Sequence, residues 1–347
     1  MVSLPGKARS NIRTINLVMA ENKQQIESDV EAAAPVFHVS SSPHLSSKSD
    51  TRRMMLDVLV ALLPVVIMAL YLFRMYAVRQ LLICVGSCLV AEALFVRMRG
   101  KSFSLNDYSA AITGVILALS LPGTAPWYVG VIAGFVAIGI GKVLFGGLGM
   151  NIFNPAMVGR AFVMISFAAA LAASGYENAQ SAVDAITQAT PMNVFKQTGV
   201  ATPLFALFTG MTNGSLGETS GLACILGGIY LCIRRTASWE IPAGVISSVL
   251  VLGGIANLIS PDSQWTVLHH LMGGALLFGA FFIATDPVTS PLTPKGKFIF
   301  GIGVGTLVML LRVFSGYPEG VMFAVLLMNA LTPLINRWTI PRPLGSQ

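Results

Sequence analysis

Charged residues are scarce in this chain. Only 11% of its 347 residues are Asp, Glu, Lys or Arg, whereas 54% are hydrophobic. A soluble globular domain carries roughly 25% charged residues, so the composition excludes a soluble globular protein and predicts a polytopic membrane protein. The formal net charge of +7 is scattered in short groups between apolar runs. That pattern excludes the basic surface of a nucleic-acid-binding protein.

Cysteine and catalytic motifs are equally sparse. The four cysteines all lie inside apolar runs, which excludes a disulfide framework and favours small packing residues in helices. A metal site shared between the pair Cys84 and Cys88 and the pair Cys224 and Cys232 is the alternative. The sequence has no serine–histidine pairing, no Walker loop and no zinc spacing, so we assign no catalytic residue to the chain in isolation.

Ten apolar runs are long enough to cross a bilayer as whole or broken helices. They lie at about 54–73, 77–96, 107–121, 127–145, 155–173, 217–233, 241–259, 267–284, 297–314 and 320–336. With ten spans, the basic groups that flank them fall mostly on one face, which places both termini in the cytoplasm. The loop after the fifth span then lies on the outer, periplasmic face.

Two parts of the chain resemble each other. The stretch LSLPGTAPW carries Pro122 and Pro126, and IATDPVTSPL carries Pro287 and Pro291 at the same separation. A repeat of five helices is odd-numbered, so its second copy enters the membrane inverted; chance similarity in Gly/Pro-rich sequence is the alternative. We therefore predict an all-α integral membrane protein of about ten transmembrane helices, in two inverted five-helix repeats with broken or re-entrant segments.

This fold divides the chain into five regions. A polar cytoplasmic N-terminal segment precedes the first repeat, an outer-face loop and re-entrant region separates the repeats, and a cytoplasmic tail follows the second. The regions are residues 1–50, 51–173, 174–216, 217–338 and 339–347.

Several ionisable residues fall within the apolar runs. Such groups cost ~2.5–3.5 kcal/mol each in the bilayer on insertion scales. We expect Glu92, Lys142 and Arg160 to face the interior of the helix bundle, as ion pairs or on a cation path. Asp286, in the stretch ATDPVTSPLTPKG, has the chemistry to ligate Na⁺ or carry a proton; with Pro287 behind it, it equally suits the cap of a short helix.

The stretch GGLGMNIFNPAMVGRAF predicts a helix that begins at Pro155 after a flexible, glycine-rich break. Asn151 and Asn154 lie at the positive end of this helix. Two side-chain amides and bare backbone N–H groups suit a planar ligand with carbonyls, or an anion. Capping by Asn154 without any ligand is the alternative.

The polar stretch AVDAITQATPMN interrupts an otherwise apolar chain. On residue chemistry alone it is a turn or a helix cap. Its pattern Asp-x-x-Thr-x-Ala-Thr nevertheless resembles the signature at which an FMN transferase links FMN, through its phosphate, to the last threonine. That threonine is Thr190 here.

The resemblance extends well beyond this motif. Residues 38–345 resemble the RnfD subunits of Rnf electron-transport complexes and, more distantly, the NqrB subunits of Na⁺-translocating NADH:quinone oxidoreductases. SSPHL, NIFNPAMVGRAF, ATDPVTSP and YPEGVMFAVLLMN carry the match in the same order along the chain. The resemblance implies a bacterial inner-membrane subunit of a translocase-type oxidoreductase complex, which couples electron transfer between NADH and ferredoxin to Na⁺ or H⁺ translocation.

The resemblance also implies site residues and partners. Thr190 would carry the covalent FMN, within a recognition frame of Asp184, Thr187, Ala189 and Pro191. A second, non-covalent flavin such as riboflavin would lie near Asn151 and Asn154, and Asp286 and Glu92 become the candidates for ion coupling. The expected partners are the other Rnf subunits (A, B, C, E and G), the FMN transferase and membrane lipid. The alternative is a urea-transporter-like channel or secondary transporter without a redox cofactor, which would need no threonine attachment signature.

Overall fold

The computed structural model describes residues 51–100, 107–173, 190–212, 214–261, 263–314 and 320–341, which contain helices and irregular segments but no strand. The long helices are α2 (Thr51–Phe73), α3 (Met75–Met98), α11 (Glu240–Ile259), α14 (Pro294–Phe314) and α15 (Val321–Thr339). Helices of intermediate length are α4 (Ser109–Ser120), α5 (Trp127–Ile138), α6 (Pro155–Ser166) and α10 (Gly221–Ile233). The short pieces are α7 (Ala168–Ala173), α8 (Pro191–Thr198), α9 (Leu204–Thr209), α12 (Val267–Met272), α13 (Leu276–Phe278) and the π-helical turns η2 (Gly139–Val143) and η3 (Gly279–Ile283).

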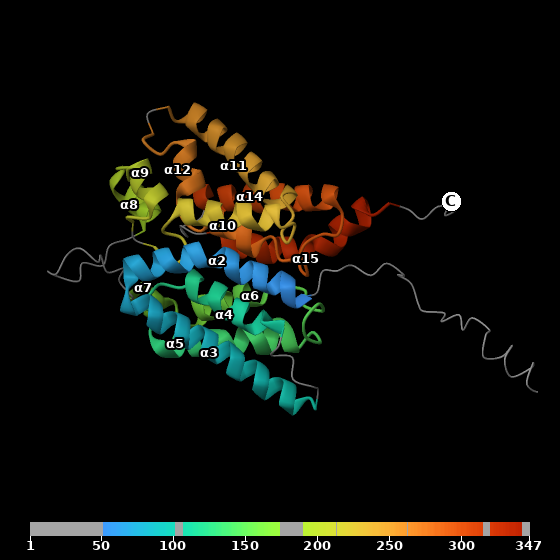
Figure 1. Ribbon diagram of the computed structural model, residues 1–347. Helices are drawn as coiled ribbons and strands as arrows, with labels where there is room; N and C mark the ends of the chain where they lie inside the picture. The colour runs from blue at the N-terminus through green and yellow to red at the C-terminus, as the bar shows by residue number, and fades with distance from the viewer. Residues whose placement is uncertain are drawn as a thin grey trace, which may run out of the picture. The chain divides into compact units, whose positions relative to one another are not determined.

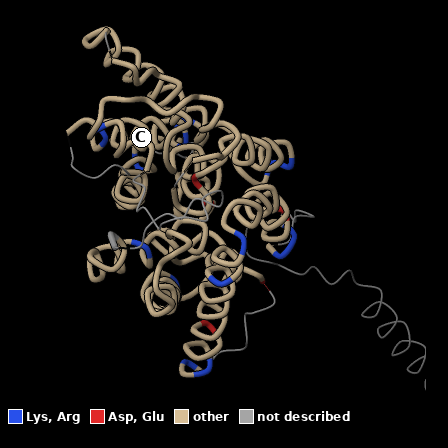
Figure 2. The backbone as a smooth tube through the Cα atoms, turned by 90° about the vertical axis from the view of Figure 1, so that its left-hand side faces the viewer, with Lys and Arg blue, Asp and Glu red and all other residues tan. Residues whose placement is uncertain are grey.

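The composition of these helices confirms an all-α, multi-pass membrane protein. The five long helices are each long and apolar enough to cross a bilayer, and shorter apolar helices accompany them. Figure 2 shows long uncharged stretches of helix, with Lys, Arg, Asp and Glu at few positions. Large apolar side chains such as Ile67, Leu82 and Leu258 are exposed on the outside of the bundle, as expected for helices whose solvent is lipid.

The helices of the two halves pair in a similar order. In the first half α3 packs against α5 and α5 against α6; in the second half α11 packs against α14 and α14 against α15. Helices α2 and α10, the first span of each half, pack against each other. Figure 1 shows α3 to α6 on one side of α2. Helices α10, α11 and α14 lie on the other side of α2. The division into two five-helix repeats and their inverted relation stay predictions.

Two of the expected transmembrane spans are divided into shorter helices. The run 267–284 is divided into α12, α13 and η3, because Gly273 and Gly274 interrupt it and Gly274 has a φ of 69°, which favours glycine. The run 155–173 is divided at Phe167 into α6 and α7. The expected break near 146–154 is present, with positive φ at Gly146, Gly147 and Gly149.

Glycine allows helices α5 and α6 to approach closely. A Cβ added to Gly159 of α6 would lie 2.4 Å from the carbonyl oxygen of Ala133 and 2.8 Å from Cβ of Ala137. Backbone cannot move out of the way as the end of a flexible side chain can, so this contact requires a residue without a side chain. Small residues at such contacts are the usual means of packing helices in lipid, where no hydrophobic effect drives association.

We therefore expect Gly159→Ala to destabilise the protein by about 2 kcal/mol through overpacking. The measurement is the midpoint of detergent-induced unfolding, followed by tryptophan fluorescence. The matched control is Gly254→Ala in α11, where an added Cβ has no atom within 4 Å. Because alanine is the better helix former, the control should be neutral or slightly stabilising. Equal midpoints for the two variants would contradict the packing argument.

Candidate functional site

Two wide helical turns precede the two breaks of the bundle. In η2 the N–H of Leu144 bonds to the carbonyl of Gly139 at 2.9 Å, and in η3 the N–H of Ala284 bonds to that of Gly279 at 2.8 Å. Each of these bonds spans five residues, one more than in an α-helix, and such π-helical turns occur frequently at functional sites. Both turns contribute a residue to the same cavity: Lys142 from η2 and Phe282 from η3.

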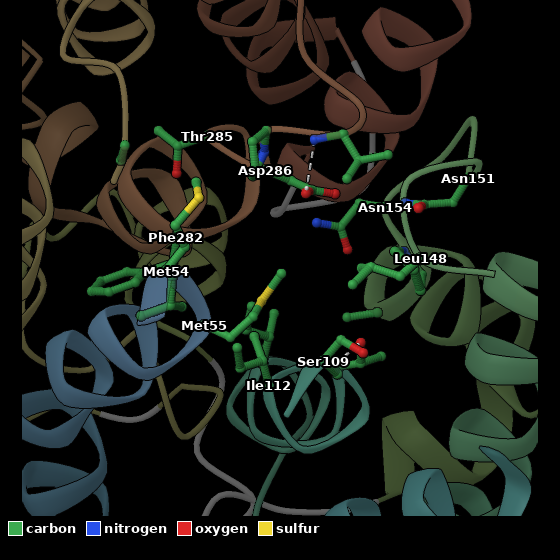
Figure 3. Close-up of a pocket in the computed structure, with 18 of the residues that line it drawn as sticks. Met54, Met55, Ser109, Ile112, Leu148, Asn151, Asn154, Phe282, Thr285 and Asp286 are labelled. Atoms are coloured by element: carbon green, nitrogen blue, oxygen red, sulfur yellow. Dashed lines mark hydrogen bonds between the residues drawn. The ribbon is translucent and has the colours of Figure 1, made fainter. Parts of the chain in front are cut away.

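The cavity lies where the broken segments of the two halves meet and has a volume of about 90 Å³. Its wall combines apolar side chains with several polar ones. Figure 3 shows Asn154 and Asp286, from two different loops, pointing toward a common space that Met55 and Ile112 close on another side. The wall also includes Met54, Ser109, Lys142 and Asn151.

Asn154 connects three segments. Its side-chain oxygen accepts from the N–H of Met157 at 3.3 Å, which confirms it as the N-cap of α6, with Pro155 in the first turn. Its amide nitrogen donates to the carbonyl of Ile283, at the end of η3, at 3.3 Å. Its backbone N–H donates to the side chain of Asn329 in α15 at 3.2 Å. Asn154 therefore fixes the break before α6 to both η3 and α15.

Asn329 continues this connection on the other side. Its amide nitrogen donates to the carbonyl of Thr289 at 3.1 Å, and the hydroxyl of Thr332 donates to the same carbonyl at 3.0 Å. Thr289 belongs to the irregular segment between η3 and α14, whose backbone cannot form a helical ladder. We call Asn154, Asn329 and Thr332 the polar clasp.

Asn151 and Asn154, the predicted flavin contacts, already form hydrogen bonds within the protein. One amide donor of Asn151 is directed at the carbonyl of Phe153 at 3.3 Å, and Asn154 uses its amide within the polar clasp. These bonds favour the capping alternative for Asn154. The cavity is also smaller than the roughly 300–1,000 Å³ of ordinary ligand pockets, so a flavin ring enters only if side chains such as Met54 move. Flavin binding by Asn151 and Asn154 stays a prediction.

Asp286 is partly buried and lines the cavity. One of its carboxylate oxygens accepts from the N–H of Val288 at 3.3 Å and the other from the hydroxyl of Thr289 at 3.1 Å. The side chain thus caps a turn, not the short helix considered in the sequence alternative. A carboxylate with only two such bonds retains lone pairs for a cation or a proton.

Glu92 lies behind Lys142, away from the cavity. The ammonium of Lys142 is 2.6 Å from Oε1 of Glu92 and donates to Oγ of Ser109 at 2.5 Å. Ser109 donates in turn to Asp107 at 2.6 Å. Arg160 forms a second buried pair with Glu218, at 3.4 Å. The expectation that Glu92, Lys142 and Arg160 face the bundle interior as ion pairs is confirmed.

The Lys142–Glu92 pair gives a test of buried charge. Lys142→Met removes the ammonium that neutralises a buried carboxylate, and breaking such a pair costs about 3–5 kcal/mol. The double variant Lys142→Met/Glu92→Gln removes both charges and should recover most of that loss, because an uncharged pair of similar volume is often neutral. The midpoint of detergent-induced unfolding measures both. If the double variant is as unstable as Lys142→Met, the loss of stability does not come from an unpaired buried carboxylate.

The attachment motif is only partly within the described residues. Asp184, Thr187 and Ala189 lie outside them. Thr190 is the N-cap residue of α8 and Pro191 is its first residue. Thr190 is 8% exposed, and its buried hydroxyl has no hydrogen-bond partner among the residues that the structure describes.

Helix α8 packs against the loop before α12, and the segment after α8 is bonded to that loop and to α12. The ring of Phe195 lies 4.9 Å from that of Trp265, and Trp265 lies 5.1 Å from the ring of His269. The segment after α8 is bonded to the same place, through Ala201 N–H to the side chain of Gln264 at 3.3 Å and Thr202 carbonyl to His269 at 3.1 Å. We call Gln264, Trp265 and His269 the docking platform.

The C-terminal end of α8 carries a positive charge, Lys196, near that of Arg312. Burial and the nearby charge of Arg312 both lower the pKa of Lys196 in the last turn of α8. An anion bound to this part of the protein would offset that repulsion.

The sequence alone did not identify Ser109, Asn329 or the docking platform. Asn329 stands in a run of apolar residues, and a lone amide in such a run is the signal that would have singled it out. The cysteine prediction holds for Cys84, Cys88 and Cys224, which are free and buried. Within the described part of the chain, no three His, Cys, Asp or Glu side chains are grouped to hold a metal ion.

Comparison with known proteins shows the family to which the chain belongs. The sequence profile of the NQR2, RnfD, RnfE family matches residues 38–345. The chain therefore belongs to this family, as the motifs predicted.

Three relatives, each named as the D component of its complex, illustrate the similarity. The chain is 40% identical to that of the Na⁺-translocating ferredoxin:NAD⁺ oxidoreductase complex of Acetobacterium woodii, over 88% of this chain and 95% of that protein. It is 39% identical to that of the proton-translocating ferredoxin:NAD⁺ oxidoreductase complex of Clostridium ljungdahlii, over 90% and 97%. It is 40% identical to that of the ion-translocating oxidoreductase complex of Stutzerimonas stutzeri, over 86% and 93%.

Proposed function

We propose that this protein is the flavin-carrying membrane subunit of an Rnf-type complex. In this complex electrons pass between ferredoxin and NADH while Na⁺ or H⁺ crosses the bacterial inner membrane. The observation that supports the proposal most directly is Thr190: a hydroxyl without a partner among the described residues, at the start of a helix, as the last residue of the attachment motif.

The residues around Thr190 fit a covalently linked FMN. The first N–H groups of a helix have no intrahelical acceptor, and the helix dipole favours a negative group there. A phosphodiester on Thr190 would lie at this end of α8. When bound, FMN supplies the redox chemistry; the chain would anchor it through Thr190, and the free N–H groups at the start of α8 would be available to its phosphate.

Partners follow from what the chain lacks. Its sequence carries no motif for binding NADH or an iron–sulfur cluster, so a protein that relays electrons needs other proteins to supply and accept them. The relatives are named as subunits of complexes. We propose the other Rnf subunits (A, B, C, E and G) as partners, and the FMN transferase for maturation on the outer face.

The cavity between the breaks supports a role in cation coupling. Asp286 reaches it directly, and Glu92 lies one residue behind, through Lys142. The two relatives at 40% and 39% identity differ in the cation that they are named for, Na⁺ in one and H⁺ in the other. We propose Asp286 as the group that binds the cation or proton, with the ion itself open between the two.

Thr190→Val should abolish covalent flavin. The complex is expressed together with its FMN transferase, separated on a denaturing gel and inspected for flavin fluorescence under ultraviolet light. We expect a fluorescent band for the parent and none for the variant, because valine has no hydroxyl to esterify. The matched control is Thr198→Val, an exposed threonine on the same helix, which should stay fluorescent.

A dark parent band, with the transferase shown to be active on another substrate, would contradict the proposal. It would favour a channel or transporter that has this fold without a redox cofactor.

Asp286→Asn should uncouple transport from electron flow. Asparagine keeps the size of the side chain and one acceptor for Val288, but not the negative charge. We expect cation uptake per electron to fall by about tenfold, equivalent to about 1.4 kcal/mol of lost stabilisation, while electron transfer from reduced ferredoxin to NAD⁺ continues. Both are measured on the whole complex in sealed vesicles. Equal loss of both activities, or no loss of either, would count against a coupling role for Asp286.

A further inference from the structure

The hydroxyl of Thr190 is inaccessible in the conformation that the structure shows. Thr190 is 8% exposed, and its Oγ1 is buried. An incoming phosphorus atom must approach this oxygen closely and in line, and an enzyme that delivers it must surround the threonine. A transferase therefore cannot act on this conformation.

The reaction makes the requirement explicit. FMN itself is a phosphate monoester, and its phosphate needs a leaving group before an alcohol can displace it; a flavin dinucleotide such as FAD supplies AMP in that role. Oγ1 of Thr190 attacks the flavin-side phosphorus, the P–O bond to AMP breaks, and the hydroxyl proton passes to a base of the transferase. No electrons are exchanged. The attack needs a freely approachable Oγ1, which α8 in its docked position does not offer.

The docking platform is the more rigid side of this contact. The guanidinium of Arg312 in α14 donates to the carbonyl of His270 and, at 2.6 Å, to that of Gly273. These bonds tie α12 to a long membrane helix. Trp265, which is only 3% exposed, also donates from its ring nitrogen to His270 at 3.3 Å. If one side of the contact moves, it is the eight-residue helix α8.

We propose that α8 is modified only while undocked, and that docking of α8 onto Trp265 and of the segment after it onto Gln264 and His269 keeps an unmodified Thr190 out of reach of the transferase. This inference rests on the proposed function, namely that Thr190 receives FMN. Docking then controls maturation: the undocked helix is the substrate of the transferase, and the docked helix is protected from it.

The test compares rates of flavin attachment. The complex is purified from cells that lack the transferase, and purified transferase and FAD are then added. Phe195→Ala removes the ring that meets Trp265 and should raise the undocked population. If docking equilibrates faster than transfer, the initial rate rises in proportion to that population. We expect an increase of about tenfold over the parent.

Two controls separate docking from general damage. Gln197→Ala changes an exposed residue of the same helix and should leave the rate unchanged. Gln264→Ala removes the side chain that accepts from Ala201 and should raise the rate as Phe195→Ala does, although by less. Agreement between variants on the two sides of the contact would exclude a local effect of Phe195 on the transferase.

An independent measurement omits the transferase altogether. Thr190→Cys places a thiol at the same position, and its alkylation by a maleimide is followed by peptide mass spectrometry, which distinguishes it from the native cysteines. We expect slow alkylation that the added change Phe195→Ala accelerates by about tenfold.

The outcomes are distinguishable. Flavin attachment and alkylation that are as fast in the parent as in Phe195→Ala would overturn the docking inference and leave Thr190 as the attachment site. Absence of attachment in the parent and all variants, including protein made together with the transferase, would overturn the proposed function and the docking inference with it.

Discussion

The structure depends on how the backbone is satisfied where helices break inside the membrane. A carbonyl or N–H group left unpaired in lipid costs several kcal/mol, so irregular backbone is tolerated there only when protein supplies the missing partners. In this chain the partners are side chains from neighbouring elements. Asn154 serves the carbonyl of Ile283, Asn329 and Thr332 serve that of Thr289, and Arg312 serves the end of α12.

The same hydrogen bonds also shape the cavity between the two helix breaks. The polar clasp holds the two breaks side by side, and the space between them becomes the cavity that Asp286 and Lys142 line. Buried charge is tolerated nearby because it is paired, as Glu92 is with Lys142. Arg312 has a second consequence. By fixing α12 it stabilises the surface onto which α8 docks, and so links a helix break to the accessibility of Thr190.

Much of this arrangement can be predicted from the sequence, for identifiable reasons. The apolar runs and the Gly/Pro breaks are local features, so the all-α membrane fold, the break at Gly146–Gly149 and the cap at Asn154 follow from short stretches. The partners of buried polar residues do not. Lys142 and Glu92 are fifty positions apart, and only the folded chain brings them together. The bonds of Arg312 were missed for a related reason: they include backbone carbonyls of a helix that no apolar run showed to be broken.

The attachment motif is a different case. Thr190 was identified through resemblance to a signature, since residue chemistry alone predicts a turn or a cap. The structure places it at the start of α8, as such a cap residue, yet its side chain makes no capping hydrogen bond to this helix. Among the residues that the structure describes, the Thr190 hydroxyl has no hydrogen-bond partner; its role as the attachment point stays a proposal.

The most direct test of the account is the stability of Asn154→Ala in protein free of flavin. This variant loses the cap of α6, about 1 kcal/mol. It also removes one of the two donors to the carbonyl of Ile283, about 0.5–1.5 kcal/mol; the N–H of Asp286 is the other donor, at 3.4 Å. Asn151→Ala, which loses a bond only to the nearby Phe153, is the comparison. We predict that the midpoint of detergent-induced unfolding falls clearly further for Asn154→Ala than for Asn151→Ala. An equal or smaller fall would show that the polar clasp does not hold the two breaks together.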